Sequence, residues 1–237
     1  MAGDHPPGST IQGVGAVLGG IQAQGYARVR TDLDVQYLLA AASLARDVHA
    51  VEGSNAERPF GDFFEKVLGY STGCVVLAAA SLEAYVNQLF ADRAQHFSVH
   101  DETVVDLIWT EYEKKSALEK FGLALSLRTG TRLDRGRATS QSIDRLIRLR
   151  NALVHFSPEW FDELGKHVQL SKQLEHYAGR SPWFPDEPLF PRAWATSSTT
   201  AWAITSVRQF VTAFAVASGL PDRFEKFSGR LSTKPEP

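Results

Sequence analysis

Three residues in the second half of the chain, Arg150, Asn151 and His155, could together act on a phosphodiester. An arginine can hold a phosphate through paired hydrogen bonds, and a histidine titrates near neutral pH and can therefore move protons. On a helix, residues four apart lie about 40° from each other, so Asn151 and His155 would share the polar edge beside Arg150. This patch suits metal-free phosphodiester cleavage. The same spacing also fits an ion-pair donor and a solvated or packed histidine, and both interpretations stay open.

Arg150 lies in the middle of the apolar arc that residues 143–156 form on a helical wheel. A guanidinium stays charged, so this position needs an acidic partner or a solvent-filled groove. Glu83 is the only charged residue between Lys66 and Asp92, in the most apolar part of the chain. We therefore predict that Glu83 and Arg150 form an ion pair across two packed helices. For Glu83 we favour the role of buried counter-ion over a direct catalytic role. The arc consists of Ile143, Leu146, Ile147, Leu149, Leu153, Val154 and Phe156.

The elements that must position these residues are helices, because apolar residues recur at helical spacing along most of the chain. The predicted helices cover residues 32–51, 63–90 (one helix, or two joined near 69–73), 103–111, 115–127, from 140 or 142 to 155 or 156, weakly 159–178, and 193–218. Core candidates in the middle of the chain include Leu107, Ile108, Leu118 and Phe121. No strand pattern is convincing in the central and C-terminal two-thirds. We expect an all-α bundle at residues 31–230 and an irregular tail or small hairpin at residues 1–30.

Composition limits the other classes of function. The chain has 237 residues, a net charge of −2 and one cysteine, Cys74, which excludes an intramolecular disulfide and a cysteine zinc site. The first residues lack the basic and apolar regions of a secretion signal, and the apolar stretch 67–91 contains Glu83, so we interpret that stretch as a buried helix. His96 and His100 have metal-ligand spacing but no evident third ligand. We expect a cytoplasmic protein without membrane contact, metal or cofactor.

Residues 113–150 are locally basic, with ten Lys or Arg against four Asp or Glu. This segment could be a track for RNA phosphates, and Arg145 and Arg148 are then the RNA-binding candidates. It could equally be a solvated basic loop around residues 128–137.

The stretch Arg145-Leu-Ile-Arg-Leu-Arg-Asn-Ala-Leu-Val-His155 resembles the signature of the HEPN superfamily, in which Arg-Asn-x3-His closes a helix of a small bundle. The segment Ala80-Ser-Leu-Glu-Ala-Tyr-Val-Asn87 is similar to the apolar helix of that family. The resemblance covers roughly residues 60–218 and implies a HEPN-like helical bundle.

Many HEPN members are metal-independent RNA endonucleases, often toxins of toxin–antitoxin, phage-defence or abortive-infection systems. The resemblance implies that Arg150 stabilises the scissile phosphate, His155 transfers protons and Asn151 orients one of them. It also implies attack by the ribose 2′-hydroxyl, an RNA substrate, and a homodimer with the motif helices at its interface. An antitoxin or defence-system partner is a further expectation. The alternative is a non-catalytic HEPN-like module that binds a protein or a nucleotide.

Overall fold

The structure is a computed structural model that describes residues 32–159 and 165–234, and all regular elements in these two ranges are helices. The all-α prediction is therefore confirmed for the described part of the chain. The chain divides into residues 1–32 and a larger unit, Leu33–Pro237. The tail or hairpin expected at residues 1–30 lies outside the described residues.

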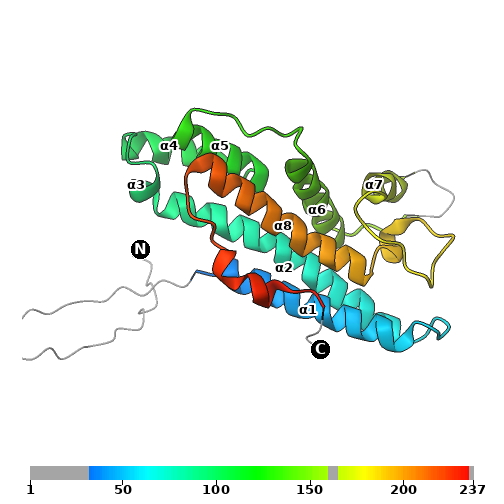
Figure 1. The fold of residues 1–237 in the computed structure, drawn as a ribbon. Coiled ribbons are helices and arrows are strands. Elements are labelled where there is room, and N and C mark those ends of the chain that lie inside the picture. Colours follow the sequence, from blue (N-terminus) through cyan, green and yellow to red (C-terminus); the bar gives the residue numbers. More distant parts are fainter. Residues whose placement is uncertain (1–31, 160–164, 235–237) are drawn as a thin grey trace, which may run out of the picture. The chain divides into compact units, whose positions relative to one another are not determined.

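Three long helices, α1, α2 and α8, lie side by side and form the centre of the larger unit (Figure 1). They cover Asp34–Asn55, Phe63–Ala91 and Ser197–Ser218, respectively. Helix α2 is continuous through residues 69–73, so this stretch forms one helix and not two joined helices. A Cβ atom at Gly73 would lie 2.8 Å from Cδ1 of Leu44, so glycine at this position allows α1 and α2 to approach closely.

Helix α2 is also the one helix of the described residues that is long and apolar enough to cross a membrane by length and composition. In the structure it contacts α1, α5, α6 and α8. A long apolar helix surrounded by other helices is typical of a core helix, because such a helix buries apolar side chains on most of its faces. These contacts favour the core interpretation of this stretch.

The shorter helices complete the bundle. They are α3 (Arg93–His96), α4 (Glu102–Tyr112), α5 (Ala117–Thr129), α6 (Ala138–Val154), α7 (Lys166–Leu174), a kinked segment η1 (Leu189–Ala193) in which the backbone of Phe190 is not helical, and a 3₁₀ helix η2 (Glu225–Leu231). Sequence periodicity did not predict α3, η1 or η2, because elements of one or two turns are too short to show it. It also placed Leu107 in the core, which is wrong, since Leu107 is 68% exposed on α4.

Helix α5 has clear local signals at both ends. The hydroxyl of Ser116 accepts a hydrogen bond from the Glu119 N–H group, and the Glu119 carboxylate accepts one from the Ser116 N–H group at 3.0 Å. This reciprocal pair is a capping box, which satisfies N–H groups that the first helical turn leaves unbonded. The helix ends at Gly130, whose φ of 71° is a left-handed conformation that favours glycine.

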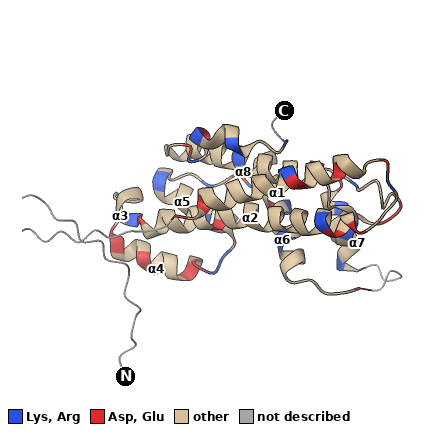
Figure 2. Cartoon of the chain, turned by 90° about the horizontal axis from the view of Figure 1, so that it is seen from below, with Lys and Arg blue, Asp and Glu red and all other residues tan. Residues whose placement is uncertain are grey.

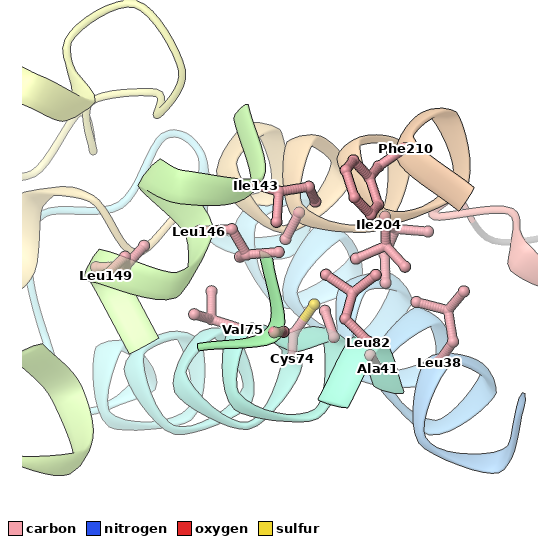
Figure 3. Close-up of a cluster of buried hydrophobic side chains, with 14 of the residues drawn as sticks. Leu38, Ala41, Cys74, Val75, Leu82, Ile143, Leu146, Leu149, Ile204 and Phe210 are labelled. Carbon is pink, nitrogen blue, oxygen red and sulfur yellow. The ribbon is translucent and has the colours of Figure 1, made fainter. Parts of the chain in front are cut away.

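The buried core joins residues of most helices, and Figure 3 shows a part of it to which α1, α2, α6 and α8 contribute. Leu38 of α1, Cys74 of α2, Ile143 of α6 and Ile204 of α8 all belong to it and are at most 1% exposed. Burial raises the pKa of the Cys74 thiol to about 12, because a thiolate would lose its hydration there. Cys74 therefore has a packing role. Helix α6, which carries the candidate site, is held by this core.

Candidate functional site

Helix α6 is amphipathic, and this decides which of its side chains can reach a ligand. Ile143, Leu146 and Leu149 are buried in the core shared with α2 and α8. The helix stops at Val154, and His155 is its C-cap with φ −112° and ψ 44°. Ser157-Pro158 follows, and a proline disfavours a helical conformation in the residue before it. The three candidate residues Arg150, Asn151 and His155 therefore lie in the last turn and cap of α6.

Arg150 and Asn151 are joined directly. The Nη1 atom of Arg150 donates a hydrogen bond to Oδ1 of Asn151 over 2.8 Å. Arg150 is half-buried and Asn151 is exposed. Across residues 32–159 and 165–234, no carboxylate forms an ion pair with Arg150. The guanidinium is thus oriented by a neutral amide and keeps its full positive charge.

His155, the C-cap of α6, is exposed. Its backbone N–H group donates to the carbonyl of Asn151 over 2.9 Å, which closes the end of the helix. Its ring makes no hydrogen bond to any residue in the described ranges. Among the described residues, both ring nitrogens are therefore available for hydrogen bonds to a ligand or to water.

Glu83 does not pair with Arg150, and this prediction is wrong. The Glu83 carboxylate pairs with the ammonium group of Lys120 on α5, which also donates to Oδ1 of Asn87 over 3.1 Å. Lys120 is 2% exposed, whereas the Glu83 side chain is 39% exposed. The reason is packing: the side chain that reaches the Glu83 turn of α2 comes from α5 and not from α6.

The sequence did contain a signal that Lys120 needs a partner. Lys120 falls between Leu118, Phe121 and Ala124, all of which are buried on α5. A charge on an apolar helix face needs a partner, as Glu83 does on α2. The ammonium group also lies 5.5 Å from the centre of the Trp109 ring, where a cation is attracted by the ring face.

Arg145 and Arg148 share one carboxylate. Nη1 of Arg145 lies 2.6 Å and Nε of Arg148 lies 2.8 Å from the same oxygen of Asp144. The three residues together keep a net positive charge, but both arginines are oriented along α6 by Asp144. Lys and Arg residues are otherwise spread over several elements of the bundle (Figure 2). Within the basic segment, Lys120 is buried and Arg128 donates to the carbonyls of His96 and Ser218.

The chain that leaves α6 is anchored to α7, a contact that sequence reasoning missed. The ring of Phe156 stacks on His167 with 5.4 Å between ring centres, and His167 meets Phe190 edge-on at 4.8 Å. The Glu159 carboxylate accepts hydrogen bonds from the backbone N–H groups of Lys166 and His167. These bonds lower the pKa of Glu159 and fix the first turn of α7. His155 therefore sits directly before an anchored segment.

The apolar arc predicted for α6 is not buried along its whole length. Val154 is 50% exposed and Phe156 is 52% exposed, although both belong to the apolar arc. Burial decreases toward this end of α6: Ile143, Leu146 and Leu149 are fully buried, whereas Ala152 and Leu153 are only partly buried against the core. An apolar surface thus borders Asn151 and His155.

Comparisons with family models, curated proteins and solved structures give no match for this chain. The fold and site together define an all-α protein with an Arg-Asn-x3-His group at the end of one amphipathic helix, in which Asn151 and His155 are exposed and Arg150 is half-buried.

Proposed function

We propose that this protein is a cytoplasmic, metal-independent endoribonuclease of the HEPN type, acting as a toxin or a phage-defence effector. The observation that carries the proposal is the orientation and the uncompensated charge of the Arg150 guanidinium. Its guanidinium is oriented by Asn151, has no carboxylate partner among the described residues, and lies in the same helix end as the exposed His155. Phosphodiester cleavage through an RNA 2′-hydroxyl requires a cation that stabilises negative charge and groups that transfer protons, and this helix end carries a residue of each type.

The proposed reaction needs two proton transfers and a group that stabilises the negative charge growing on the phosphate oxygens. The 2′-oxygen of the ribose bonds to phosphorus and loses its proton, and the bond from phosphorus to the 5′-oxygen breaks as that oxygen gains a proton. The products are a 2′,3′-cyclic phosphate and a 5′-hydroxyl end, and no water is consumed. His155 transfers a proton, and Arg150 binds the phosphate oxygens as their charge grows. DNA lacks the 2′-hydroxyl and stays uncut.

The proposed active form is a homodimer in which two α6 ends meet. Val154 and Phe156 support this, because they are apolar, half exposed and adjacent to the site. Their burial against a second copy would remove apolar surface from water and bring a second His155 to the same phosphate. Each copy would then supply one of the two proton transfers.

Glu83 acts in this proposal through stability alone. Its carboxylate compensates the buried Lys120, so its removal would leave a charge in the core. Arg145 and Arg148, fixed by Asp144, are proposed to contact RNA phosphates away from the scissile bond.

The test is incubation of the purified protein with single-stranded and structured RNA in EDTA, followed by analysis of the product ends. Wild type is compared with Arg150→Ala, His155→Ala and the matched control His176→Ala, which removes an exposed histidine of a different segment. We expect cleavage with cyclic phosphate ends from wild type and the control. Both site variants should lose at least a hundredfold in rate, since general acid–base catalysis contributes about 10²- to 10⁴-fold.

Three outcomes contradict the proposal. Absence of cleavage by a folded dimer across the RNA panel favours the non-catalytic binding module instead. Equal cleavage by wild type and both site variants places the activity elsewhere or in a contaminant. Loss of activity in EDTA that returns with a divalent ion refutes the metal-independent mechanism. Growth arrest on expression, relieved by a neighbouring gene product, would identify the antitoxin arrangement.

A further inference from the structure

A groove lies at the opposite end of α6 from the candidate site. A cavity of about 850 Å³ is bounded by the start of α6 and the C-terminal half of α8, and its walls include Arg137, Arg208, Thr205, Gln209 and Val216. A neighbouring cavity of about 360 Å³ shares Arg137 and Thr139 with it and extends to Arg132. Together they form one groove with three arginines along it, which we name the α6–α8 groove.

The arginines of the α6–α8 groove are available to a ligand. Neither Arg132 nor Arg208 forms a side-chain hydrogen bond or ion pair with any residue of the described ranges. Arg137 lies 3.7 Å from Asp134, and both side chains are more than 60% exposed, so this contact is weak. The groove walls therefore carry three arginines and one carboxylate, that of Asp134. The groove therefore attracts anions.

The floor of the α6–α8 groove is apolar. Phe210 and Phe214 are buried beneath it, and Ala213, Val216 and Ala217 form the wall on α8. Val216 is 82% exposed. A groove that combines unpaired guanidinium groups with an apolar wall suits a ligand that has both phosphates and flat apolar faces.

The exposed face of α6 connects this groove to the candidate site. Arg137, Gln141, Asp144, Arg148, Asn151 and His155 follow one another at alternating spacings of four and three residues, which places them on one face of the helix. All are exposed except Asp144, which is half-buried and pairs with Arg148. The face runs for about 27 Å, since each helical residue adds about 1.5 Å. An extended phosphate chain is a better match to this length than a small molecule.

We infer that the α6–α8 groove is a second binding site for single-stranded RNA, which holds the strand at the start of α6 while its scissile phosphate lies at Arg150. The strand follows the exposed face of α6, with phosphates on Arg208, Arg137 and Arg148 and bases against Ala217 and Val216. This inference rests on the proposed function for its ligand. It adds a site remote from the reacting atoms, which sets affinity for longer RNA and not the rate of bond cleavage.

The test measures binding of a labelled single-stranded RNA long enough to span α6, in a His155→Ala background that prevents cleavage. The groove variant is Arg137→Gln with Arg208→Gln, and the control is Arg230→Gln, an exposed arginine of η2. Each phosphate contact on a single strand contributes about 0.7 to the salt slope, so two lost contacts weaken binding about 25-fold at about 0.1 M salt and lower the slope by about 1.4. The control should bind like its parent.

A second variant tests the groove without changing any of its arginines. Val216→Glu places a carboxylate on the apolar wall at an exposed helical position where the fold tolerates it, and we expect at least fivefold weaker RNA binding with an unchanged thermal midpoint. In the wild-type background, neither groove variant should alter cleavage of a dinucleotide, which is too short to reach the groove.

The outcomes separate the inference from the proposed function. If wild type binds RNA through the groove but cleaves nothing, the function fails and the second binding site stands. If wild type cleaves RNA while both groove variants bind as tightly as their parent, the inference is refuted and the function stands. If inorganic pyrophosphate binds to wild type and not to the groove variant, but RNA of any length does not bind, the site takes small phosphates and the inference is refuted.

Discussion

The ammonium group of Lys120 is buried against the carboxylate of Glu83, which remains partly exposed. The two partners therefore differ in what their loss costs. Without Glu83, Lys120 keeps only the Asn87 oxygen and the Trp109 ring for its charge. Without Lys120, Glu83 can be hydrated from the surface.

This asymmetry predicts unequal stability effects. Glu83→Ala should lower the free energy of unfolding by about 3 kcal/mol, because an uncompensated charge stays in the core. Lys120→Met should cost about 1 kcal/mol, since it preserves the apolar stem and leaves an exposed carboxylate. The double variant should be more stable than Glu83→Ala alone. Urea unfolding measures all three, and a larger loss for Lys120→Met than for Glu83→Ala would contradict the buried-lysine interpretation.

The Arg150–Asn151 hydrogen bond predicts a charge effect on RNA binding. Asn151→Asp keeps an acceptor for Arg150 but converts the contact into an ion pair that offsets the positive charge. We expect at least fivefold weaker RNA binding and slower cleavage, with stability unchanged within about 0.5 kcal/mol because the position is exposed. Asn151→Ser, which adds no charge, is the control for the loss of the amide. Equal RNA affinity for Asn151→Asp and wild type would show that Arg150 does not contact phosphate.

The exposed end of the α6 apolar arc is the interface that we propose for the homodimer. Val154→Glu should shift the protein from dimer to monomer, because a carboxylate would have to lose its hydration at the interface. Val99→Glu is a matched control, since Val99 is 81% exposed on a segment that joins α3 to α4. Sedimentation velocity at several concentrations measures both variants. A dimer that persists in Val154→Glu would place the interface elsewhere.

The capping box of α5 predicts a loss of stability in acid. The hydrogen bonds from Ser116 lower the pKa of Glu119 below its ordinary value of 4.5. Its carboxylate therefore stabilises the folded state fully above that value, and this contribution disappears as the pH falls through the lower pKa of the folded state. Glu119→Gln, which does not titrate, should lose less stability than wild type between neutral pH and acid. Thermal midpoints measured against pH compare the two, and parallel curves would show that Glu119 makes no such contribution.

The burial of Cys74 predicts an inert thiol. It is 0% exposed and its pKa is raised to about 12, so almost no thiolate exists at neutral pH. A disulfide reagent such as dithiobis-nitrobenzoate should react with it only after unfolding in guanidinium chloride. Reaction of the native protein at the rate of a free thiol would indicate that the core around α2 opens readily.

The sequence by itself determined the all-α class and the approximate position of every helix longer than two turns. Periodic apolar residues and Ser157-Pro158 act within one or two turns of their own position, so they can be interpreted without the rest of the chain. The sequence also determined that Arg150, Asn151 and His155 lie in one helix end, because their spacing is local. Cys74 in an apolar run was correctly expected to be buried.

Only the tertiary structure decided which helices cover which turns. Glu83 and Lys120 are 37 residues apart. No local sequence pattern shows that α5, and not α6, packs against the turn of α2 that carries Glu83. The exposure of Leu107, Val154 and Phe156 was decided in the same way, because an apolar side chain is buried only where another element lies over it. The α6–α8 groove likewise joins residues from distant parts of the chain and becomes visible only once the bundle is assembled.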